Sequence, residues 1–221
     1  MANDARRATG SAAGTSSGVV DKKVLLAQVT EGGRLYGEGE FEKAKQIFRK
    51  AWALARHAGI ASGTIEWSLA ICHERLGEFE PAVEHIQAAL ALDPFDGAYN
   101  NSYSVIVARL RDAVAFVGNL GGDPDTERYY ALLLRIGEAD VAAHLVAARH
   151  LLAVGRAPEA LRVLDALTVL SPSCASAWSL LAEAAAAIGD SARAHRARVE
   201  AACCRDAVAP GLIDEGKRAQ A

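Results

Sequence analysis

A glycine-rich stretch at residues 118–122 is the segment whose residue types come closest to a chemical site. Backbone amides at a helix start can bind phosphate, because their partial positive charge favours an anion. Here Asp123 and Asp125 would place negative charge beside the phosphate, and no Lys-Ser or Lys-Thr pair follows. The sequence therefore predicts a loop without a nucleotide or other cofactor, with Asp123 capping a helix from Pro124 to Ile136.

Metal-ligating and nucleophilic residue types are present, but without the spacings that their chemistry requires. The histidines are His57, His73, His85, His144, His150 and His195, and the cysteines are Cys72, Cys174, Cys203 and Cys204. Neither set has the paired spacing of a zinc site or of a disulfide framework. No nucleophile elbow accompanies the Ser, His and Asp residues. We therefore predict a non-catalytic protein without a metal site, with buried cysteines and with histidines at the surface or in a groove.

Charge and hydropathy narrow the class of partner. The chain has 24 basic and 27 acidic residues and a formal net charge of -3, so it offers no general attraction to nucleic acid or to an anionic membrane. Arginines gather at residues 193–205, but on several helix faces and with Glu200 among them. No stretch approaches 18 uninterrupted apolar residues, and residues 1–20 lack the apolar run of a signal peptide. We expect a cytoplasmic protein of bacterial type with a disordered leader at residues 1–22, without nucleic-acid binding or membrane insertion.

An internal repeat organises the rest of the chain. A glycine followed five residues later by an alanine recurs in equivalent surroundings, as Gly39 and Ala44, Gly77 and Ala82, Gly155 and Ala160, and Gly189 and Ala194. The last two alanines are 34 residues apart, a period typical of stacked helix pairs. The repeat predicts that each glycine ends the first helix of a pair and that each alanine lies on the second.

The recurring residue types have a physical reason. A glycine after the first helix adopts the left-handed conformation that reverses the chain without a side-chain penalty. Small residues at facing positions, such as Gly32 opposite Ala44, let the two helix axes approach closely. Larger residues such as Phe48 and Leu164 then fill the space towards the next pair, so that stability is a sum over neighbouring repeats.

These choices resemble the tetratricopeptide repeat, whose first helix carries Trp, Leu, Gly and Tyr and whose second carries Ala, Phe, Ala and a final Pro. The resemblance implies an all-α fold, a right-handed superhelical solenoid of about five antiparallel helix pairs. The repeat domain is expected at 23–208, in units 25–62, 63–96, 97–140, 141–174 and 175–208, before a C-terminal cap or tail at 209–221. The third unit is irregular, because its first helix continues from Gly97 to about Val117 before the glycine-rich loop.

The same resemblance implies where a partner would bind, since the first helices of the pairs line a concave groove in this family. The residues expected to contact the partner are Tyr36, Trp67, Ile71, Arg75, Arg109, Leu145 and Arg149. Other inward positions are Leu26, Val29, Thr64, Asn101, Ser102, Val105, Ser179 and Glu183. Apolar and arginine side chains together favour an apolar peptide bearing carboxylates. The alternative for Trp67 and Leu145 is that adjacent helices cover them and that they only complete the core.

A non-catalytic scaffold or adaptor that holds a peptide segment of another protein is therefore the leading functional hypothesis. A narrower alternative is a bacterial secretion or assembly chaperone that shields a hydrophobic segment. An alternative of another class is an enzyme or small-ligand sensor whose pocket lies in the third unit, around Tyr99, Tyr103, Tyr129 and Tyr130. A homo-oligomer through the last helix pair also stays open, because an incompletely capped solenoid exposes an apolar end. The repeat does not encode the identity of the partner.

Overall fold

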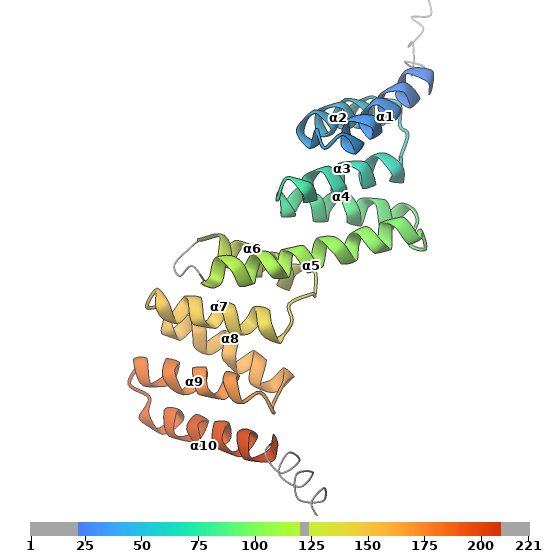
Figure 1. The fold of residues 1–221 in the computed structure, drawn as a ribbon. Helices are drawn as coiled ribbons and strands as arrows, with labels where there is room; N and C mark the ends of the chain where they lie inside the picture. Colours follow the sequence, from blue (N-terminus) through green and yellow to red (C-terminus); the bar gives the residue numbers. More distant parts are fainter. Residues whose placement is uncertain (1–21, 120–123, 209–221) are drawn as a thin grey trace, which may run out of the picture. The chain divides into compact units, whose positions relative to one another are not determined.

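The computed structural model describes residues 22–119 and 124–208, and all regular elements in these ranges are helices (Figure 1). The all-α prediction is confirmed. The predicted leader, apart from Lys22, the predicted Asp123 cap and the predicted tail lie outside the described residues. The chain divides into two compact parts, residues 1–100 and 101–221, called here the N-terminal half and the C-terminal half. None of the described helices has the length and apolarity that crossing a membrane requires.

Four complete helices belong to the N-terminal half. They are α1 (Lys22–Gly37), α2 (Phe41–His57), α3 (Gly63–Arg75) and α4 (Phe79–Leu92). The helix α5 (Gly97–Asn119) begins in this half and continues into the other, where α6 (Pro124–Arg135), α7 (Val141–Ala153), α8 (Ala157–Leu170), α9 (Ala175–Ala187) and α10 (Ser191–Val208) follow. The long helix from Gly97 and the helix that begins at Pro124 agree with the sequence-based expectation to within two residues.

The glycines of the repeat close the first helix of each pair in the same way. Gly39, Gly77, Gly155 and Gly189 all have φ between 76° and 81°, as the sequence predicts. At the end of α7, the amide of Arg156 donates to the carbonyl of Leu151 at 2.8 Å, and the amide of Gly155 donates to that of Leu152 at 3.0 Å. This pair of bonds satisfies carbonyls that the helix end would otherwise leave without partners.

Replacement of such a glycine should cost stability for a backbone reason alone. Nothing lies within 4 Å of a Cβ at Gly155, so Gly155→Ala creates no clash but forces alanine into a left-handed conformation. We expect the free energy of unfolding to fall by roughly 1 kcal/mol, measured by urea denaturation. Gly97→Ala is the matched control, because that site is equally open and lacks a positive φ. Equal losses in the two variants would contradict the explanation.

The core of the N-terminal half lies between α1, α2 and α3. It contains Ala44, Phe48 and Ala51 of α2 against Ile65 and Leu69 of α3. Gly32 of α1 is buried, and a Cβ there would lie 2.6 Å from the Phe48 ring. The close approach predicted at Gly32 therefore accommodates the Phe48 ring.

The core of the C-terminal half is continuous through α7, α8, α9 and α10 and includes Leu151, Leu164, Leu181 and Ala194. Where α5 packs on α7, Gly118 of α5 makes room for Val146 of α7. A Cβ at Gly118 would lie 2.0 Å from the Cγ1 atom of Val146. Helix α5 is also tied to the loop before α7.

That tie is made by Arg111. Its Nη2 donates to the backbone carbonyl of Glu138 at 2.8 Å and to the Oε2 of the same residue at 2.9 Å, and its Nε lies 3.4 Å from Oδ2 of Asp140. The long helix α5 is thereby fixed against the α6–α7 connection within the C-terminal half.

Two sequence-based predictions about burial are wrong in part. Of the four cysteines only Cys72 is buried, whereas Cys203 is exposed and Cys174 and Cys204 are intermediate. Burial raises the pKa of the Cys72 thiol to about 12. Of the six histidines, His73, His144 and His150 are buried, although the sequence places them at the surface or in a groove. Each has a polar partner that makes burial tolerable: Glu78 for His73, the backbone carbonyl of Asp140 at the start of the same helix for His144, and Glu127 of α6 for His150.

Candidate functional site

First helices of successive pairs contact one another in both halves. In the N-terminal half α1 contacts α3, and in the C-terminal half α7 contacts α9, in addition to the contacts between consecutive helices. Residues on these first helices therefore form a shared face within each half, called here the A-helix surface. Six of the seven predicted partner-binding residues lie on these helices, and the seventh, Arg109, lies on α5, the first helix of the third pair.

At one end of the A-helix surface of the N-terminal half, Tyr36 and Arg75 meet on Phe41. The Tyr36 and Phe41 rings are 5.2 Å apart in an edge-on arrangement, and the Arg75 guanidinium lies 5.0 Å from the centre of the Phe41 ring. Tyr36 is half-buried and Arg75 is exposed. The contact holds Arg75 by a cation–π interaction and leaves its charge accessible to solvent.

Trp67 and Ile71 lie one turn apart on α3, and both are half-buried. The Trp67 ring lies 6.2 Å from the ring of Tyr99, which is buried at the start of α5. Trp67 therefore packs on Tyr99 and stays partly exposed. The structure brings Tyr36, Trp67, Ile71 and Arg75 together on neighbouring helices α1 and α3.

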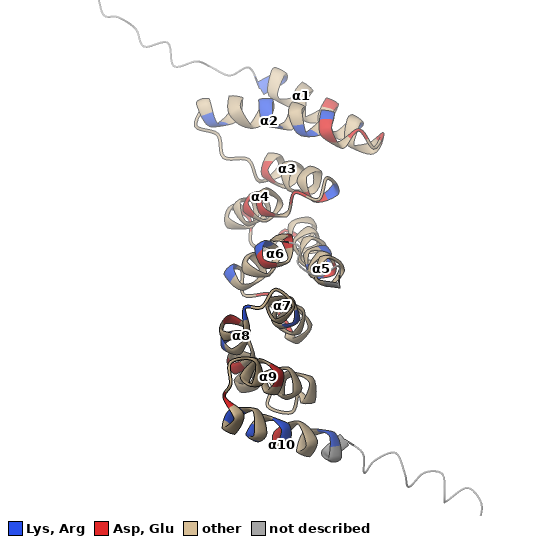
Figure 2. Ribbon diagram, turned by 90° about the vertical axis from the view of Figure 1, so that its left-hand side faces the viewer, with Lys and Arg blue, Asp and Glu red and all other residues tan. Residues whose placement is uncertain are grey.

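The three predicted residues of the C-terminal half differ among themselves. Arg109 on α5 and Arg149 on α7 are exposed. Leu145 is half-buried and packs against the core of α7–α10, which supports the alternative that this side chain completes the core. Figure 2 shows basic and acidic residues distributed over both halves, although single helices such as α4, with Glu80 and Glu84, carry charges of one sign.

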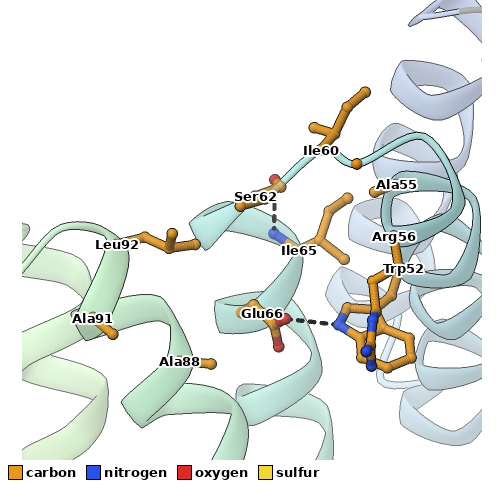
Figure 3. Close-up of a pocket in the computed structure, with 12 residues that line it drawn as sticks. Trp52, Ala55, Arg56, Ile60, Ser62, Ile65, Glu66, Ala88, Ala91 and Leu92 are labelled. Carbon is orange, nitrogen blue, oxygen red and sulfur yellow. Dashed lines mark hydrogen bonds between the residues drawn. The ribbon is translucent and has the colours of Figure 1, made fainter.

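A cleft that the sequence did not indicate lies beside α2, α3 and α4 in the N-terminal half (Figure 3). Its volume is about 460 Å³. Trp52 and Arg56 of α2, Ile60 of the following loop, Glu66 of α3 and Leu92 of α4 are among the residues that line it. We call it the α2–α4 cleft. None of its lining residues is among the predicted partner-binding residues, because the family geometry selects one face of the first helices and this cleft lies on another.

Comparison with known families identifies the repeat. The tetratricopeptide repeat model matches residues 30–114 and 145–207, which together exceed half of the chain. The chain belongs to the tetratricopeptide repeat family. Proteins of this family serve as scaffolds for protein–protein interaction, and that coarse function follows for this chain. No curated protein matches the sequence.

Solved structures with similar folds include three tetratricopeptide repeat or related proteins. YrrB, a tetratricopeptide repeat protein with an unusual peptide-binding site, is 17% identical, with 84% of this chain and 89% of that chain covered and a TM-score of 0.36. PilF of Pseudomonas aeruginosa is 17% identical, with 83% and 77% covered and a TM-score of 0.38. A thermophilic tetratricopeptide repeat protein of Thermus thermophilus is 18% identical, with 82% and 98% covered and a TM-score of 0.36. These similarities concern the fold alone.

Behind the α2–α4 cleft, a polar network crosses the interface between the first two repeats. Glu66 accepts hydrogen bonds from Trp52 Nε1 at 2.7 Å and from His85 Nδ1 at 2.6 Å. The ring of His85 stacks on that of His73 with 5.5 Å between centroids and 13° between planes. The network thus connects α2, α3 and α4 through side chains that are distant in the sequence.

The network continues to a buried lysine. His73 Nδ1 lies 2.5 Å from Glu78 Oε2, and both Glu78 oxygens lie 3.0 Å from Nζ of Lys45. Lys45 also pairs with Glu42 at 2.9 Å. Burial opposes the charge on Lys45, but hydrogen bonds from its ammonium to Glu42 and Glu78 raise the pKa of Lys45 above its usual value. A local signal for this site exists, since Lys45 lies at helical spacing from Phe41 and Phe48 on the buried face of α2.

Acidification is expected to destabilise the N-terminal half through His73. Burial lowers the pKa of His73, and the neighbouring His85 and Lys45 act in the same direction, against the carboxylate of Glu78. Unfolded histidine binds a proton near pH 6.5, so below that pH the unfolded state holds more protons than the folded state. Stability therefore falls as the pH decreases from about 6.5 towards the lower folded pKa.

The pH effect is measured by hydrogen exchange of amides in α2–α4 between pH 7.5 and 5.5, after correction for the intrinsic exchange rate. His73→Gln should flatten the pH dependence of the opening free energy. His57→Gln, at an exposed position on α2, should leave it unchanged. A pH dependence that persists in the His73 variant would reject the assignment.

The four tyrosines of the small-ligand alternative occupy packing positions. Tyr99 belongs to the N-terminal half and packs on Trp67. In the C-terminal half, Tyr129 and Tyr130 are buried, with Tyr130 edge-on to His144 at 5.4 Å, while the Tyr103 hydroxyl lies 3.3 Å from Glu138. A cavity of about 300 Å³ between α5 and α7 is lined by other residues, Arg111 and Asp112 among them. Among the described residues, no three His, Cys, Asp or Glu side chains are placed to hold a metal ion.

Proposed function

We propose that this tetratricopeptide repeat protein is a non-catalytic scaffold or adaptor that binds an extended or helical segment of another protein on its A-helix surface. The observation that carries this proposal is the contact between successive first helices, α1 with α3 and α7 with α9. A segment laid across such neighbours would touch several repeats at once. Binding energy would then come from many repeats, as is usual for surfaces of stacked repeats.

The residues of the N-terminal half suggest the chemistry of the bound segment. Trp67 and Ile71 offer half-buried apolar area, and Arg75 offers an exposed charge that Phe41 holds in place. A rigid aromatic beside an arginine is a common combination at the energetic centre of interfaces. This supports a segment with apolar side chains and carboxylates. In the C-terminal half, the exposed Arg109 and Arg149 would serve the same carboxylate-binding role.

The test begins with copurification and mass spectrometry to identify a partner, followed by affinity measurements on variants of the full chain. Trp67→Ala and Arg149→Ala should each weaken binding about tenfold, on the order of 1.4 kcal/mol. The controls are Phe95→Ala, whose side chain is 93% exposed in the α4–α5 loop, and Arg162→Ala on α8. Unchanged affinity in the first two variants, with binding traced to other faces, would reject the A-helix surface.

A narrower form of the proposal is a bacterial secretion or assembly chaperone acting in the cytoplasm. It is favoured by the adjacent apolar side chains of Trp67 and Ile71, which could shield a hydrophobic segment of a client. The chaperone should reduce light scattering by an aggregating client at stoichiometric amounts, and Trp67→Ala should lose this effect. If the client scatters as much light with the protein as without it, the chaperone form is refuted and the adaptor form is left in place.

Self-association through the last helix pair is not part of this proposal. The exposed side chains of α10 include His195, Arg196 and Arg198, which suit a solvated end of the repeat array more than an interface between copies. Multi-angle light scattering of the full chain measures the oligomeric state directly.

A further inference from the structure

The α2–α4 cleft has an apolar floor and an exposed apolar rim. Ile65, with 2% of its surface exposed, and the buried Ala55 form the inner wall. Ile60 and Leu92 line the same cleft and are 36% and 49% exposed, from the α2–α3 loop and the end of α4 respectively (Figure 3). A volume of about 460 Å³ lies within the range of pockets that accept ligands, roughly 300–1,000 Å³. The shape therefore suits a bulky apolar side chain.

The charged side chains of the cleft are one carboxylate, Glu66, and one arginine, Arg56. Both oxygens of Glu66 already accept hydrogen bonds from within the protein, one from Trp52 and one from His85. Arg56 is exposed, and its guanidinium lies 4.7 Å from the centre of the Trp52 ring. No carboxylate of the described residues lies within ion-pair distance of Arg56. The charged group left to bind a partner is thus the exposed guanidinium of Arg56, which lies over an aromatic ring beside an apolar cavity.

A related cleft occurs in the C-terminal half between α8, α9 and α10. It has a volume of about 400 Å³ and is lined by Trp178, by Val169, which is 80% exposed, and by the exposed Arg196. Trp178 precedes Ala194 by as many residues as Glu66 precedes Ala82, so the two clefts use the same position of the repeat. Here Arg193 pairs with Asp165, and no carboxylate of the described part of the chain is within ion-pair distance of Arg196. Glu200 lines this cleft as well, so its lining carries two arginines and two carboxylates.

We propose that the α2–α4 cleft is a second protein-binding site, separate from the A-helix surface, which takes a bulky apolar side chain of a partner segment while Arg56 binds a neighbouring carboxylate of that segment. The inference rests on the proposed function in so far as the ligand is a segment of another protein. It adds a site between the second helices α2 and α4, and it states which side chains of a partner segment this site selects. The apolar wall supplies affinity, and the arginine supplies discrimination between acidic and basic flanks.

The test uses the full chain labelled with ¹⁵N and follows the indole Nε1–H resonances of Trp52 and Trp67. The probe is a capped heptapeptide with one leucine between two glutamates in Gly-Ser surroundings. A second peptide carries lysines in place of the glutamates, and a third carries alanine in place of the leucine. We expect the glutamate–leucine peptide to move the Trp52 resonance and to bind at least fivefold more tightly than either of the other peptides.

Variants of the chain separate the two parts of the site. Arg56→Gln should abolish the difference between the glutamate and lysine peptides, and Ala91→Phe, which fills the cleft from its exposed end, should weaken binding at least fivefold. Arg49→Gln, at an exposed position on α2 outside the cleft, should retain both affinity and discrimination. Equal binding of the two charged peptides would overturn the proposal. So would an Arg56→Gln variant that still binds the glutamate peptide more tightly than the lysine peptide. A peptide that moves Trp67 and not Trp52 would also overturn it, while the A-helix surface would still stand.

Discussion

Leu164→Ala is expected to lower the stability of the C-terminal half by about 2–5 kcal/mol, the range for removing a fully buried leucine from a core that relaxes only in part. Leu164 has no exposed surface and lies in the cluster that joins α7, α8, α9 and α10. Because each repeat is stabilised by its neighbours, a cavity at this position weakens the packing on both sides of α8.

Leu170→Ala is the matched control, since the same substitution is made on the same helix at a side chain that is 71% exposed. Hydrogen exchange of amides in α7–α10 measures the local opening free energy without assuming that the whole chain unfolds in one step. Protection should collapse in the Leu164 variant and change by less than about 0.5 kcal/mol in the control. Similar changes in the two variants would contradict a core centred on α8.

The helices and their turns could be predicted from the sequence because their determinants are local. A left-handed glycine at Gly39 or Gly155 can be recognised within one short phrase, and Pro124 marks a helix start in the same way. The apolar stripe of α2 through Ala44, Phe48 and Ala51 follows from helical spacing alone. Local rules of this kind decide which segments are helical and which face of each helix is buried.

The polar network could not be predicted, because its partners meet only through packing. Glu66 pairs with Trp52, 14 residues away, and with His85, 19 residues away, on two other helices. A histidine on a mixed helix face gives no indication of whether an acceptor from another helix lies opposite, so His73 and His85 could not be told apart from His57. The α2–α4 cleft has the same origin, since its walls come from three helices and one loop.

The A-helix residues fall between these cases. Family geometry predicts that Trp67, Ile71 and Arg75 lie on the first helix of a pair, as they do on α3, but their degree of exposure depends on neighbours such as Tyr99 and Phe41. Leu145 shows the limit, because the same reasoning assigned it to the groove and the structure packs it against the core. Sequence periodicity fixes the side of a helix and leaves open whether another helix covers it.

Phe48→Ala is expected to have the largest effect in the N-terminal half, about 3–5 kcal/mol, since the ring is 2% exposed and fills the core between α1, α2 and α3. Gly32→Ala should cost about 1–3 kcal/mol in the same measurement, because its Cβ would lie 2.6 Å from that ring, which is itself buried in the core. Gly37→Ala, near the end of α1, where nothing lies within 4 Å, is the control for the added methyl group.

The two substitutions should not be additive. Once Phe48 is replaced, the clash at Gly32 disappears and the new methyl group occupies part of the cavity, while alanine also favours the helical state of α1 over glycine. The double variant Gly32→Ala/Phe48→Ala should therefore be at least as stable as Phe48→Ala alone, with a coupling energy on the order of 1–3 kcal/mol. Additive losses would mean that the close approach of α1 to the Phe48 ring does not determine the packing of this hairpin.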